Sequence, residues 1–498
     1  MLFDVLSETA HAHPDKIAVA GERRSLTYSQ LHHEASCFAL YLEELGFKSG
    51  ESIFIGLPSS PDFFVAIYGA WALGLLVVPV SPTGPIASTY LATNPVGAIG
   101  TPDFLKQIKA QCRGLRTVIP CSSSGGFAVT DFPGELKSRR PFKQEAVLCV
   151  SSSGTTGEPK LYQRSCELIH GHARTRVEVQ QINSSDIFLS MRPLNNANAI
   201  NNFVVPPIMA GAKVILHERF ERFKAVDAIR AERVTVLNSV PFVFELLASI
   251  PESRPVDFSS IRMCIAGGAP LPPSVADQFF RRFGMRIHQR YAGSHFYPAF
   301  SFNFDGPSDS VGRIDGYFPM VILDEDGKRL EPGRIGEIAF TYANLPPTLQ
   351  RVAESNPNRQ NDCILTGDLG RTDADGNVFV VGRRSPFIKI GGNRVEPAEV
   401  ESTLRSHPAV REALVYPLRQ GQTDEAIGAM VAASNVSEQE LLQHCADHLE
   451  AFKCPRQIDV KDELPRTEQG KISRRLFESL QWLILILEGA NNCANIYV

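Results

Sequence analysis

Residues 151–160 read Ser-Ser-Ser-Gly-Thr-Thr-Gly-Glu-Pro-Lys, and an apolar run over 146–150 that predicts a β-strand comes directly before them. Small residues let a loop turn successive backbone N–H groups inward, where these amides and the Ser and Thr hydroxyls can cradle a polyphosphate. Lys160 adds a positive charge at the end of the loop. A Walker phosphate loop would end in Gly-Lys-Ser/Thr, so the pattern disfavours that class of NTPase. The simpler alternative is a polar loop that joins a strand to a helix.

Strand and helix patterns alternate on both sides of this loop. Short apolar runs predict strands over 53–55, 75–80, 146–150, 187–191, 213–216, 234–237 and 263–266, and a helix over 62–73. Helical spacing between several of these runs predicts βαβ units and largely parallel sheets. Between 311 and 382, short alternating strands and turns such as Asp326-Gly327 predict a compact β-rich subdomain. The chain after a boundary near 384 predicts a last, smaller α/β unit.

The composition is that of an ordinary globular protein. The chain has 498 residues, 43% hydrophobic content and a formal net charge of −4, which give it no overall attraction to nucleic acid or anionic membranes. Its ten cysteines are scattered without a Cys-x-x-Cys pair, so we expect reduced thiols in a cytoplasmic protein. The start of the chain lacks the basic and apolar regions of a signal peptide. The apolar clusters at 63–80 and 482–487 predict no transmembrane segment, because glycines break the first and the second is too short.

The loop at 151–160 resembles the signature of the acyl-adenylate-forming superfamily, which includes acyl-CoA synthetases, nonribosomal adenylation domains and beetle luciferases. Further matches follow in the order of that family: Ala266-Gly267-Gly268-Ala269-Pro270, Tyr291 to His295, Leu365 to Gly370, Gly382 to Glu401, and Leu464 to Ile472. The resemblance covers residues from about Leu6 to Leu476. It implies an α/β fold with a large N-terminal AMP-binding domain (1–383), built from two βαβ sheets and a β-rich subdomain, and a small α+β domain (384–478) that rotates about a hinge. Residues 479–498 form a tail of unknown role.

The resemblance also implies which residues bind the nucleotide and the thiol. Lys471 would be the catalyst of adenylation, and Ser294 would contact the α-phosphate. Tyr291 would stack on adenine. Asp368 would accept hydrogen bonds from both ribose hydroxyls, because a carboxylate has two acceptor oxygens. The other implied nucleotide- and thiol-binding positions are Ser152, Ser153, Gly154, Thr155, Thr156, Gly157, Lys160, Gly268, Ala269, Pro270, Arg383, Lys389, Gly391 and Gly392.

Several positions depart from the family pattern. His295 stands where the family has a glutamate that helps to hold Mg²⁺, a metal that prefers oxygen ligands. Either ATP phosphates and water hold the metal here, or the activity is weakened, or His295 fills the acyl pocket. Ala292 replaces a glycine. At the hinge, Ser385-Pro386 replaces the usual Asp or Lys, and because proline restricts the backbone this change bears on hinge rotation and thiol transfer.

The pocket for the acyl group is expected around residues 192–206, 240–244 and 269–300. Its candidate residues are Asn196, Asn198, Val240 and Gly293. The asparagine side chains can bind a polar acid, or they can cap a helix. No aspartate is placed to bind an α-amino group, which disfavours amino acids and leaves aliphatic and aromatic acids open.

The function predicted from these residues is that of an ATP-dependent carboxylic acid:thiol ligase. The enzyme would use ATP and Mg²⁺, form an acyl-AMP with release of pyrophosphate, and pass the acyl group to coenzyme A. One alternative is an enzyme that loads the phosphopantetheine arm of an acyl carrier protein. A second alternative is an AMP-binding protein of the same fold without catalysis. We expect a carboxylic acid as substrate and no nucleic-acid partner.

Overall fold

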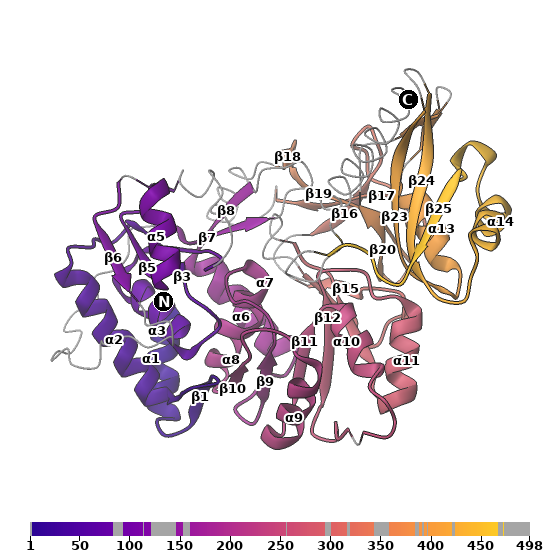
Figure 1. The fold of residues 1–498 in the computed structure, drawn as a ribbon. Coiled ribbons are helices and arrows are strands. Elements are labelled where there is room, and N and C mark those ends of the chain that lie inside the picture. The colour runs from indigo at the N-terminus through magenta and orange to yellow at the C-terminus, as the bar shows by residue number, and fades with distance from the viewer. Residues whose placement is uncertain are drawn as a thin grey trace, which may run out of the picture.

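The computed structural model describes most of the chain. The described residues are 2–82, 93–112, 114–120, 146–152, 160–254, 256–293, 300–315, 319–342, 358–383, 388–390, 393–395, 397–420, 424–466 and 472. Within them, two mainly parallel sheets and a β-rich subdomain precede a smaller C-terminal part, drawn in orange and yellow in Figure 1. The predicted fold class is confirmed.

The six-stranded sheet carries the two ends of the predicted phosphate loop. Its order is β6-β5-β3-β4-β7-β8, and its neighbours are parallel except for β7 and β8. The strands are β3 Ser52–Gly56, β4 Leu76–Pro79, β5 Gly97–Gly100, β6 Thr117–Pro120, β7 Ala146–Ser152 and β8 Lys160–Ser165. The strands predicted at 53–55, 75–80 and 146–150 therefore correspond to β3, β4 and β7.

The seven-stranded sheet has the order β13-β12-β11-β9-β10-β1-β2, and only β2 runs antiparallel to its neighbour. Its strands are β1 Ile17–Ala20, β2 Ser25–Thr27, β9 Ile187–Ser190, β10 Lys213–Leu216, β11 Val236–Ser239, β12 Met263–Gly267 and β13 Ile287–Arg290. The strand predicted to start at Val234 starts at Val236 instead. The Val234 N–H donates to the Ile229 carbonyl and Arg233 has a left-handed φ of 54°, so these two residues end the preceding helix.

Helices cover the two sheets, and the largest apolar core includes residues of both sheets and of the helices between them. The helices are α1 Leu2–Ala12, α2 Tyr28–Glu44, α3 Pro61–Leu73, α5 Pro102–Gln111, α6 Cys166–Val179, α7 Ala197–Ala199, the π-helix Ile200–Val204, α8 Pro206–Met209, α9 Arg222–Glu232, α10 Pro241–Ala248 and α11 Pro273–Phe283.

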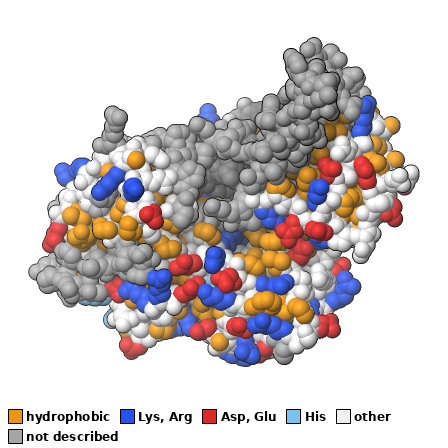
Figure 2. All heavy atoms as spheres, in the orientation of Figure 1, with side chains coloured by type: hydrophobic (Ala, Val, Ile, Leu, Met, Phe, Trp, Pro, Cys, Tyr) orange, Lys and Arg blue, Asp and Glu red, His pale blue; other side chains and the backbone are white. Residues whose placement is uncertain are grey.

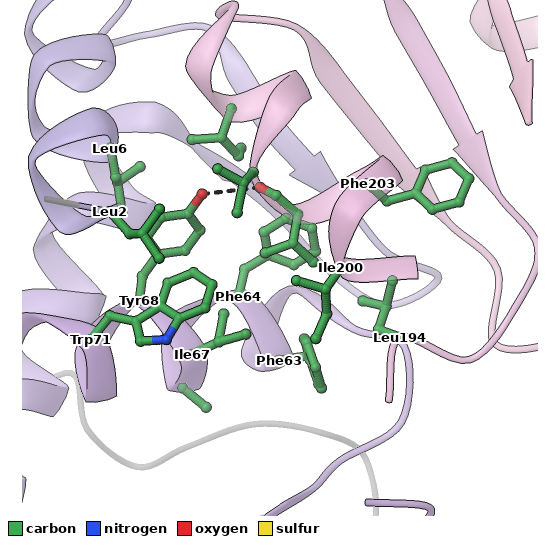
Figure 3. Close-up of a cluster of buried hydrophobic side chains, with 14 of the residues drawn as sticks. Leu2, Leu6, Phe63, Phe64, Ile67, Tyr68, Trp71, Leu194, Ile200 and Phe203 are labelled. Carbon is green, nitrogen blue, oxygen red and sulfur yellow. Dashed lines mark hydrogen bonds between the residues drawn. The ribbon is translucent and has the colours of Figure 1, made fainter. Parts of the chain in front are cut away.

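Helix α3 is apolar on nearly every side, and a helix of that kind belongs in a protein interior. Pro61 starts it, and Gly74 ends it with a left-handed φ of 76°. Figure 3 shows its aromatic side chains beside α1 and the π-helix. The Tyr68 hydroxyl donates a 2.9 Å hydrogen bond to the Val204 carbonyl there. The apolar run at 63–80 is thus a buried helix, a glycine turn and a strand, as predicted.

The β-rich subdomain and the C-terminal part complete the fold. The first contains the pair β14 Phe300–Phe302 and β15 Arg313–Asp315, and an antiparallel sheet of β16 Met320–Leu323, β17 Gly336–Thr341, β18 Arg359–Gln360, β19 Cys363–Thr372 and β20 Val378–Arg383. The second contains β21 Ile388–Ile390, β22 Asn393–Val395, α13 Pro397–Ser406, β23 Val410–Gln420, β24 Asp424–Ala433, α14 Glu438–His448, the 3₁₀ helix Ala451–Lys453 and β25 Gln457–Lys461. Residues 384–387, where we predict the domain boundary, lie outside the described residues.

Charges of both signs are interspersed on the face drawn in Figure 2, in agreement with the near balance of 50 basic and 54 acidic residues. No helix in the described part of the chain combines the length and the apolar character needed to cross a membrane.

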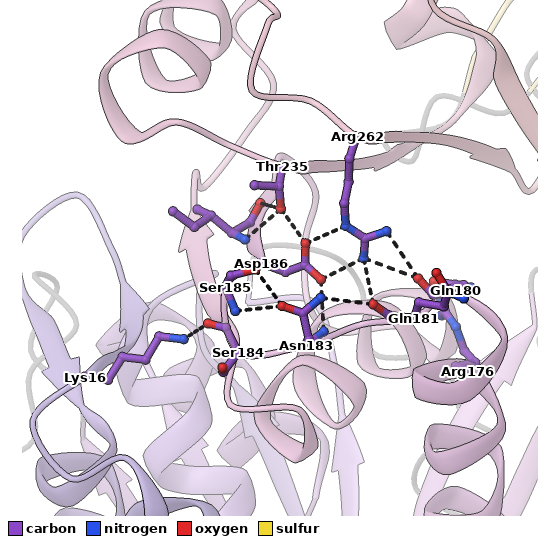
Figure 4. Close-up of polar contacts among 11 residues, drawn as sticks. Lys16, Arg176, Gln180, Gln181, Asn183, Ser184, Ser185, Asp186, Thr235 and Arg262 are labelled. Carbon is purple, nitrogen blue, oxygen red and sulfur yellow. Dashed lines mark hydrogen bonds and ion pairs between the residues drawn. The ribbon is translucent and has the colours of Figure 1, made fainter.

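An ion pair between a buried carboxylate and a partly exposed arginine ties together the amino ends of three strands in the seven-stranded sheet (Figure 4). Asp186 immediately precedes β9, Thr235 precedes β11, and Arg262 precedes β12. The Asp186 side chain is 1% exposed, and its carboxylate accepts 2.7 Å hydrogen bonds from Nε and Nη2 of Arg262 and a 2.8 Å hydrogen bond from the Thr235 hydroxyl. Burial raises the pKa of the Asp186 carboxyl, but the hydrogen bonds from Arg262, Asn183 and Thr235 outweigh it, so the pKa lies below its ordinary value.

We expect Asp186→Asn to lower the free energy of unfolding by about 2 kcal/mol at neutral pH, because it leaves Arg262 without its counter-ion. A carboxyl with a lowered folded-state pKa stabilises the protein above its unfolded pKa of about 3.9, and this contribution is lost as the pH falls through the folded-state value. The difference between wild type and variant should therefore shrink below about pH 4. Urea denaturation across a pH series measures it.

The matched control is Asp227→Asn, which removes an exposed ion pair with Arg254 and should change the stability by less than about 0.5 kcal/mol. Equal effects of the two variants at neutral pH would contradict a structural role for the Asp186 carboxylate.

Candidate functional site

The carboxyl edge of the seven-stranded sheet brings two predicted nucleotide-binding segments side by side. Strands β12 and β13 are parallel neighbours, and their last residues, Gly267 and Arg290, are paired in register. The loop 268–270 and Tyr291 therefore leave the sheet at the same place. Gly268 has a φ of 87°, a conformation that favours glycine, and residues 268–270 are exposed. An exposed backbone of small residues next to an aromatic ring is a suitable surface for a flat base.

Tyr291 joins this edge to the β-rich subdomain. Its ring packs against the apolar cluster of that subdomain, and its hydroxyl donates a 2.6 Å hydrogen bond to Oδ2 of Asp368. Asp368 lies on β19, where it is paired with Arg383 at the end of β20. Three residues predicted to contact the nucleoside thus come together, although Asp368 is 77 positions from Tyr291. Nothing is described of the Arg383 side chain.

The backbone before Asp368 has a local reason for its shape. The Thr366 hydroxyl donates 2.6 Å to the Ile338 carbonyl and accepts from the Asp368 N–H at 3.1 Å. Gly367 has a φ of 72°, and its N–H donates to the Glu337 carboxylate at 3.1 Å. The pairing with β17 shifts register at this point. The Thr-Gly-Asp motif is therefore an irregular strand segment that holds a carboxylate, and a carboxylate that already accepts a phenol hydroxyl is chemically suited to accept a ribose hydroxyl.

The predicted phosphate loop connects two antiparallel strands. Ser152 at the end of β7 is paired with Lys160 at the start of β8, so the two ends of the loop lie next to each other. The structure thus differs from the simpler alternative of a strand-to-helix connection, because six residues of β8 precede α6. The loop residues Ser153, Gly154, Thr155, Thr156 and Gly157 lie outside the described residues.

The two candidate asparagines of the acyl pocket do different things. Asn196 caps α7: its Oδ1 accepts from the Ala199 N–H at 3.0 Å, and its Nδ2 donates to the Pro193 carbonyl at 2.9 Å. Asn198 accepts a 2.7 Å hydrogen bond from Nη2 of Arg290. Val240 is buried at the start of α10, and Gly293 follows Tyr291 by two residues. Their roles in binding an acid remain predictions.

Sequence reasoning missed the polar network around Arg290. Asn202 accepts hydrogen bonds from Arg290, from Arg176 and, at 2.8 Å, from Asn238. These side chains come from β13, α6, β11 and the π-helix. The available signal was the density of asparagine between 195 and 202, which is unusual in a segment that is otherwise apolar and buried.

Several predicted residues lie outside the described part of the chain. They are Ser294, His295, Ser385, Gly391, Gly392 and Lys471. The backbone of Lys389 is described, on β21, but its side chain is not. Among the described residues, no three His, Cys, Asp or Glu side chains lie together as metal ligands would.

The C-terminal part contacts α10, the helix that follows Val240. Arg411 forms a 3.0 Å ion pair with Glu245, and the Arg466 guanidinium lies 4.1 Å from the centre of the Phe242 ring. Arg466 also forms an isolated antiparallel bridge with Ile472. The ends of the segment that contains Lys471 are therefore adjacent to each other, and one of them is held against the large domain.

Comparison with known proteins agrees with this architecture. The sequence profile of the family described as "AMP-binding enzyme" matches residues 6–345, and that of "AMP-binding enzyme C-terminal domain" matches residues 399–471. Indoleacetate–CoA ligase of Aromatoleum aromaticum is 28% identical over 95% of this chain and 96% of its own. Medium-chain fatty-acid–CoA ligase of Escherichia coli is 27% identical over 95% of this chain and 89% of its own. The structure of ATP-bound MatB from Rhodopseudomonas palustris has a TM-score of 0.84 at 22% identity and covers 96% of this chain and 98% of that chain, which confirms the fold.

We expect Tyr291→Phe to weaken the binding of ATP, the nucleotide implied by the resemblance, by about tenfold, because a hydrogen bond to a charged group contributes roughly 1.5 kcal/mol. The variant keeps the aromatic ring but releases Asp368 from its orienting partner. Isothermal titration measures the dissociation constant.

Tyr342→Phe is the matched control. Tyr342 lies in the same apolar cluster, and its hydroxyl donates 2.6 Å to the backbone carbonyl of Asn361, away from Tyr291. Its loss should leave ATP binding unchanged. An unchanged affinity in Tyr291→Phe would show that this hydrogen bond does not shape the nucleotide site.

Proposed function

The chain belongs to the AMP-binding enzyme family, and from that membership we propose that it activates a carboxylic acid with ATP and transfers the acyl group to the thiol of coenzyme A. The observation that carries the proposal is the contact of Tyr291 with Asp368, which unites two distant motifs at one sheet edge. The names of the relatives at 27–28% identity, both CoA ligases, support coenzyme A as the acceptor.

In the first half-reaction, a carboxylate oxygen of the acid attacks the α-phosphorus of ATP. The bond between that phosphorus and the bridging oxygen breaks, and pyrophosphate leaves with the electron pair. Both reactants are anions, so the barrier is largely electrostatic and positional. Backbone amides and hydroxyls of the loop 151–160 would hold the phosphates, and the Lys471 ammonium would bridge the attacking carboxylate and the α-phosphate.

The contacts of Arg466 support this role for Lys471. Arg466 rests on Phe242 of α10, and Glu412 of β23 accepts a 2.6 Å hydrogen bond from its guanidinium. The chain returns to Arg466 at Ile472, one residue after Lys471. Lys471, which lies between these two residues in the sequence, would thus act on the large domain while the C-terminal part contacts it.

In the second half-reaction, the thiol sulfur attacks the acyl carbon, AMP leaves with the carboxyl oxygen, and the thiol proton passes to solvent. We place the boundary between the two domains at 383/384, so that the C-terminal domain covers 384–478 and turns about Ser385. Gly391 and Gly392 would then border the path of the pantetheine. A docked domain shields the adenylate from water until the thiol arrives.

Two alternatives make different predictions for the acceptor and for the chemistry. A ligase that loads a carrier protein would prefer a phosphopantetheinylated carrier to free coenzyme A in a competition assay. A protein of this fold without catalysis would bind ATP or AMP and exchange no pyrophosphate with any acid.

We expect acid-dependent exchange of labelled pyrophosphate into ATP, and a loss of about a hundredfold or more in Lys471→Ala, because the lysine stabilises charge in the transition state. The same variant should still form thioester from a supplied acyl-adenylate and coenzyme A. Lys461→Ala, a change of an exposed lysine at the end of β25, is the matched control and should exchange at the wild-type rate.

If Lys471→Ala exchanges pyrophosphate at the wild-type rate, Lys471 takes no part in the adenylation step. Measurable ATP binding without exchange for a broad panel of aliphatic, aromatic and amino acids would overturn the enzyme proposal.

A further inference from the structure

Two buried arginines lie at the carboxyl edge of the seven-stranded sheet, inside the segments expected to form the acyl pocket. Arg192 follows β9 by two residues and Arg290 ends β13, and each is only 7% exposed. Burial lowers the pKa of Arg192 to about 10, and burial together with the nearby Arg192 charge lowers the pKa of Arg290 to about 10. Both guanidinium groups are therefore still positively charged at neutral pH, and they repel each other.

Neither cation has a carboxylate partner in the described part of the chain. Arg290 donates to the amide oxygens of Asn198 and Asn202, which are neutral, and its buried Nε has no partner among the described residues. The Arg192 guanidinium has neither a hydrogen bond nor an ion pair within those residues. A buried charge without a counter-ion is strongly unfavourable, so an anion is expected to complete this site.

Other partly buried arginines of this protein show the contrast. Arg262 is paired with Asp186, and Arg24 is paired with Glu34 and Asp62. These two guanidinium groups thus have carboxylate partners, whereas the fully buried Arg176 donates to the neutral oxygens of Asn201, Asn202 and Gln180. At Arg290 the fold supplies amides, which orient the cation but leave its charge uncompensated.

Arg290 and its neighbour Tyr291 have different hydrogen-bond partners. The Tyr291 hydroxyl donates to Asp368 in the β-rich subdomain, whereas the Arg290 guanidinium donates to Asn198 and Asn202. Gly267 lies next to the guanidinium: an added Cβ there would be in ordinary van der Waals contact with Nε and Nη2 of Arg290, at 3.5 Å and 3.6 Å. The cation lies among the residues predicted for the acyl group.

We propose that the acid substrate carries a second anionic group, as a short aliphatic dicarboxylic acid does, and that Arg290 and Arg192 bind this group while the first carboxylate reacts with ATP. This inference rests on the proposed function. The planar fork of a guanidinium matches a carboxylate with two parallel hydrogen bonds. Arg290 and Arg192 would thus determine specificity.

The test compares short dicarboxylic acids, their monomethyl esters and monocarboxylic acids of equal length in the pyrophosphate exchange assay with the wild-type protein. The ester keeps the length and removes one charge. We expect the diacid to exceed its ester in kcat/KM by about a hundredfold or more, because the ester leaves buried cations unpaired. An acid with a terminal phosphonate in place of the second carboxylate distinguishes carboxylate recognition from general anion recognition.

Arg290→Met should reduce the preference for the diacid over its ester to less than about tenfold, with an unchanged dissociation constant for ATP. Arg290→Lys, which keeps a charge, should retain part of the preference. Arg254→Met, a change of an exposed arginine on the surface, is the matched control and should keep the wild-type ratio. If Arg290→Met does not fold, the wild-type selectivity and Arg192→Met test the proposal.

The outcomes separate the two proposals. If monocarboxylic acids or the monomethyl esters support exchange at rates equal to or above those of the diacids, the inference about the second anionic group is wrong. The proposed function is unaffected by that result. The absence of exchange with any acid, while ATP binds, overturns the proposed function and the inference with it. Equal loss of ATP binding and of diacid activity in Arg290→Met would assign Arg290 to the nucleotide phosphates and overturn the inference.

Discussion

The ion pair of Asp186 and Arg262 holds together the amino ends of β9 and β12, and Thr235 adds β11 to the same contact. Because these strands are parallel and in register, fixing their starts also fixes where they end. The residues that follow the strands, such as Arg192 and Tyr291, then meet at the opposite edge, where ligands bind in open α/β sheets. A contact at the amino edge thus helps to position the groups that we propose bind the ligands at the opposite edge.

The β-rich subdomain depends on the same edge. Tyr291 leaves the last strand of the seven-stranded sheet and enters the apolar cluster of the subdomain, so its ring joins the two bodies by packing. Its hydroxyl then orients Asp368. A single residue therefore links the sheet edge, where the base would lie, to the carboxylate that would bind the ribose. This link explains why two motifs far apart in the chain can serve one nucleotide.

Charge is handled differently at the two edges of the sheet. At the amino edge the Arg262 guanidinium, whose side chain is 34% exposed, pairs with the buried carboxylate of Asp186, so its charge is compensated within the protein. At the carboxyl edge Arg290 is surrounded by the amides of Asn198 and Asn202. An amide can orient a cation, but it cannot neutralise it, so the site keeps its affinity for an external anion. The asparagines of the π-helix segment are thus part of the site, although they interrupt an apolar core.

The sequence alone was sufficient for the order of the elements and for the family. Local patterns encode local structure: the apolar run of α3 between Pro61 and Gly74 predicts one buried helix, and the Thr-Gly-Asp motif predicts a carboxylate at Asp368. The sequence did not distinguish the two uses of asparagine. Asn196 caps a helix by accepting a hydrogen bond from Ala199, three residues later in the chain. Asn198 accepts a hydrogen bond from Arg290, which is 92 residues away in the sequence. Only the tertiary structure decided that pairing, because it depends on which strand ends beside the π-helix and not on any neighbour in the chain.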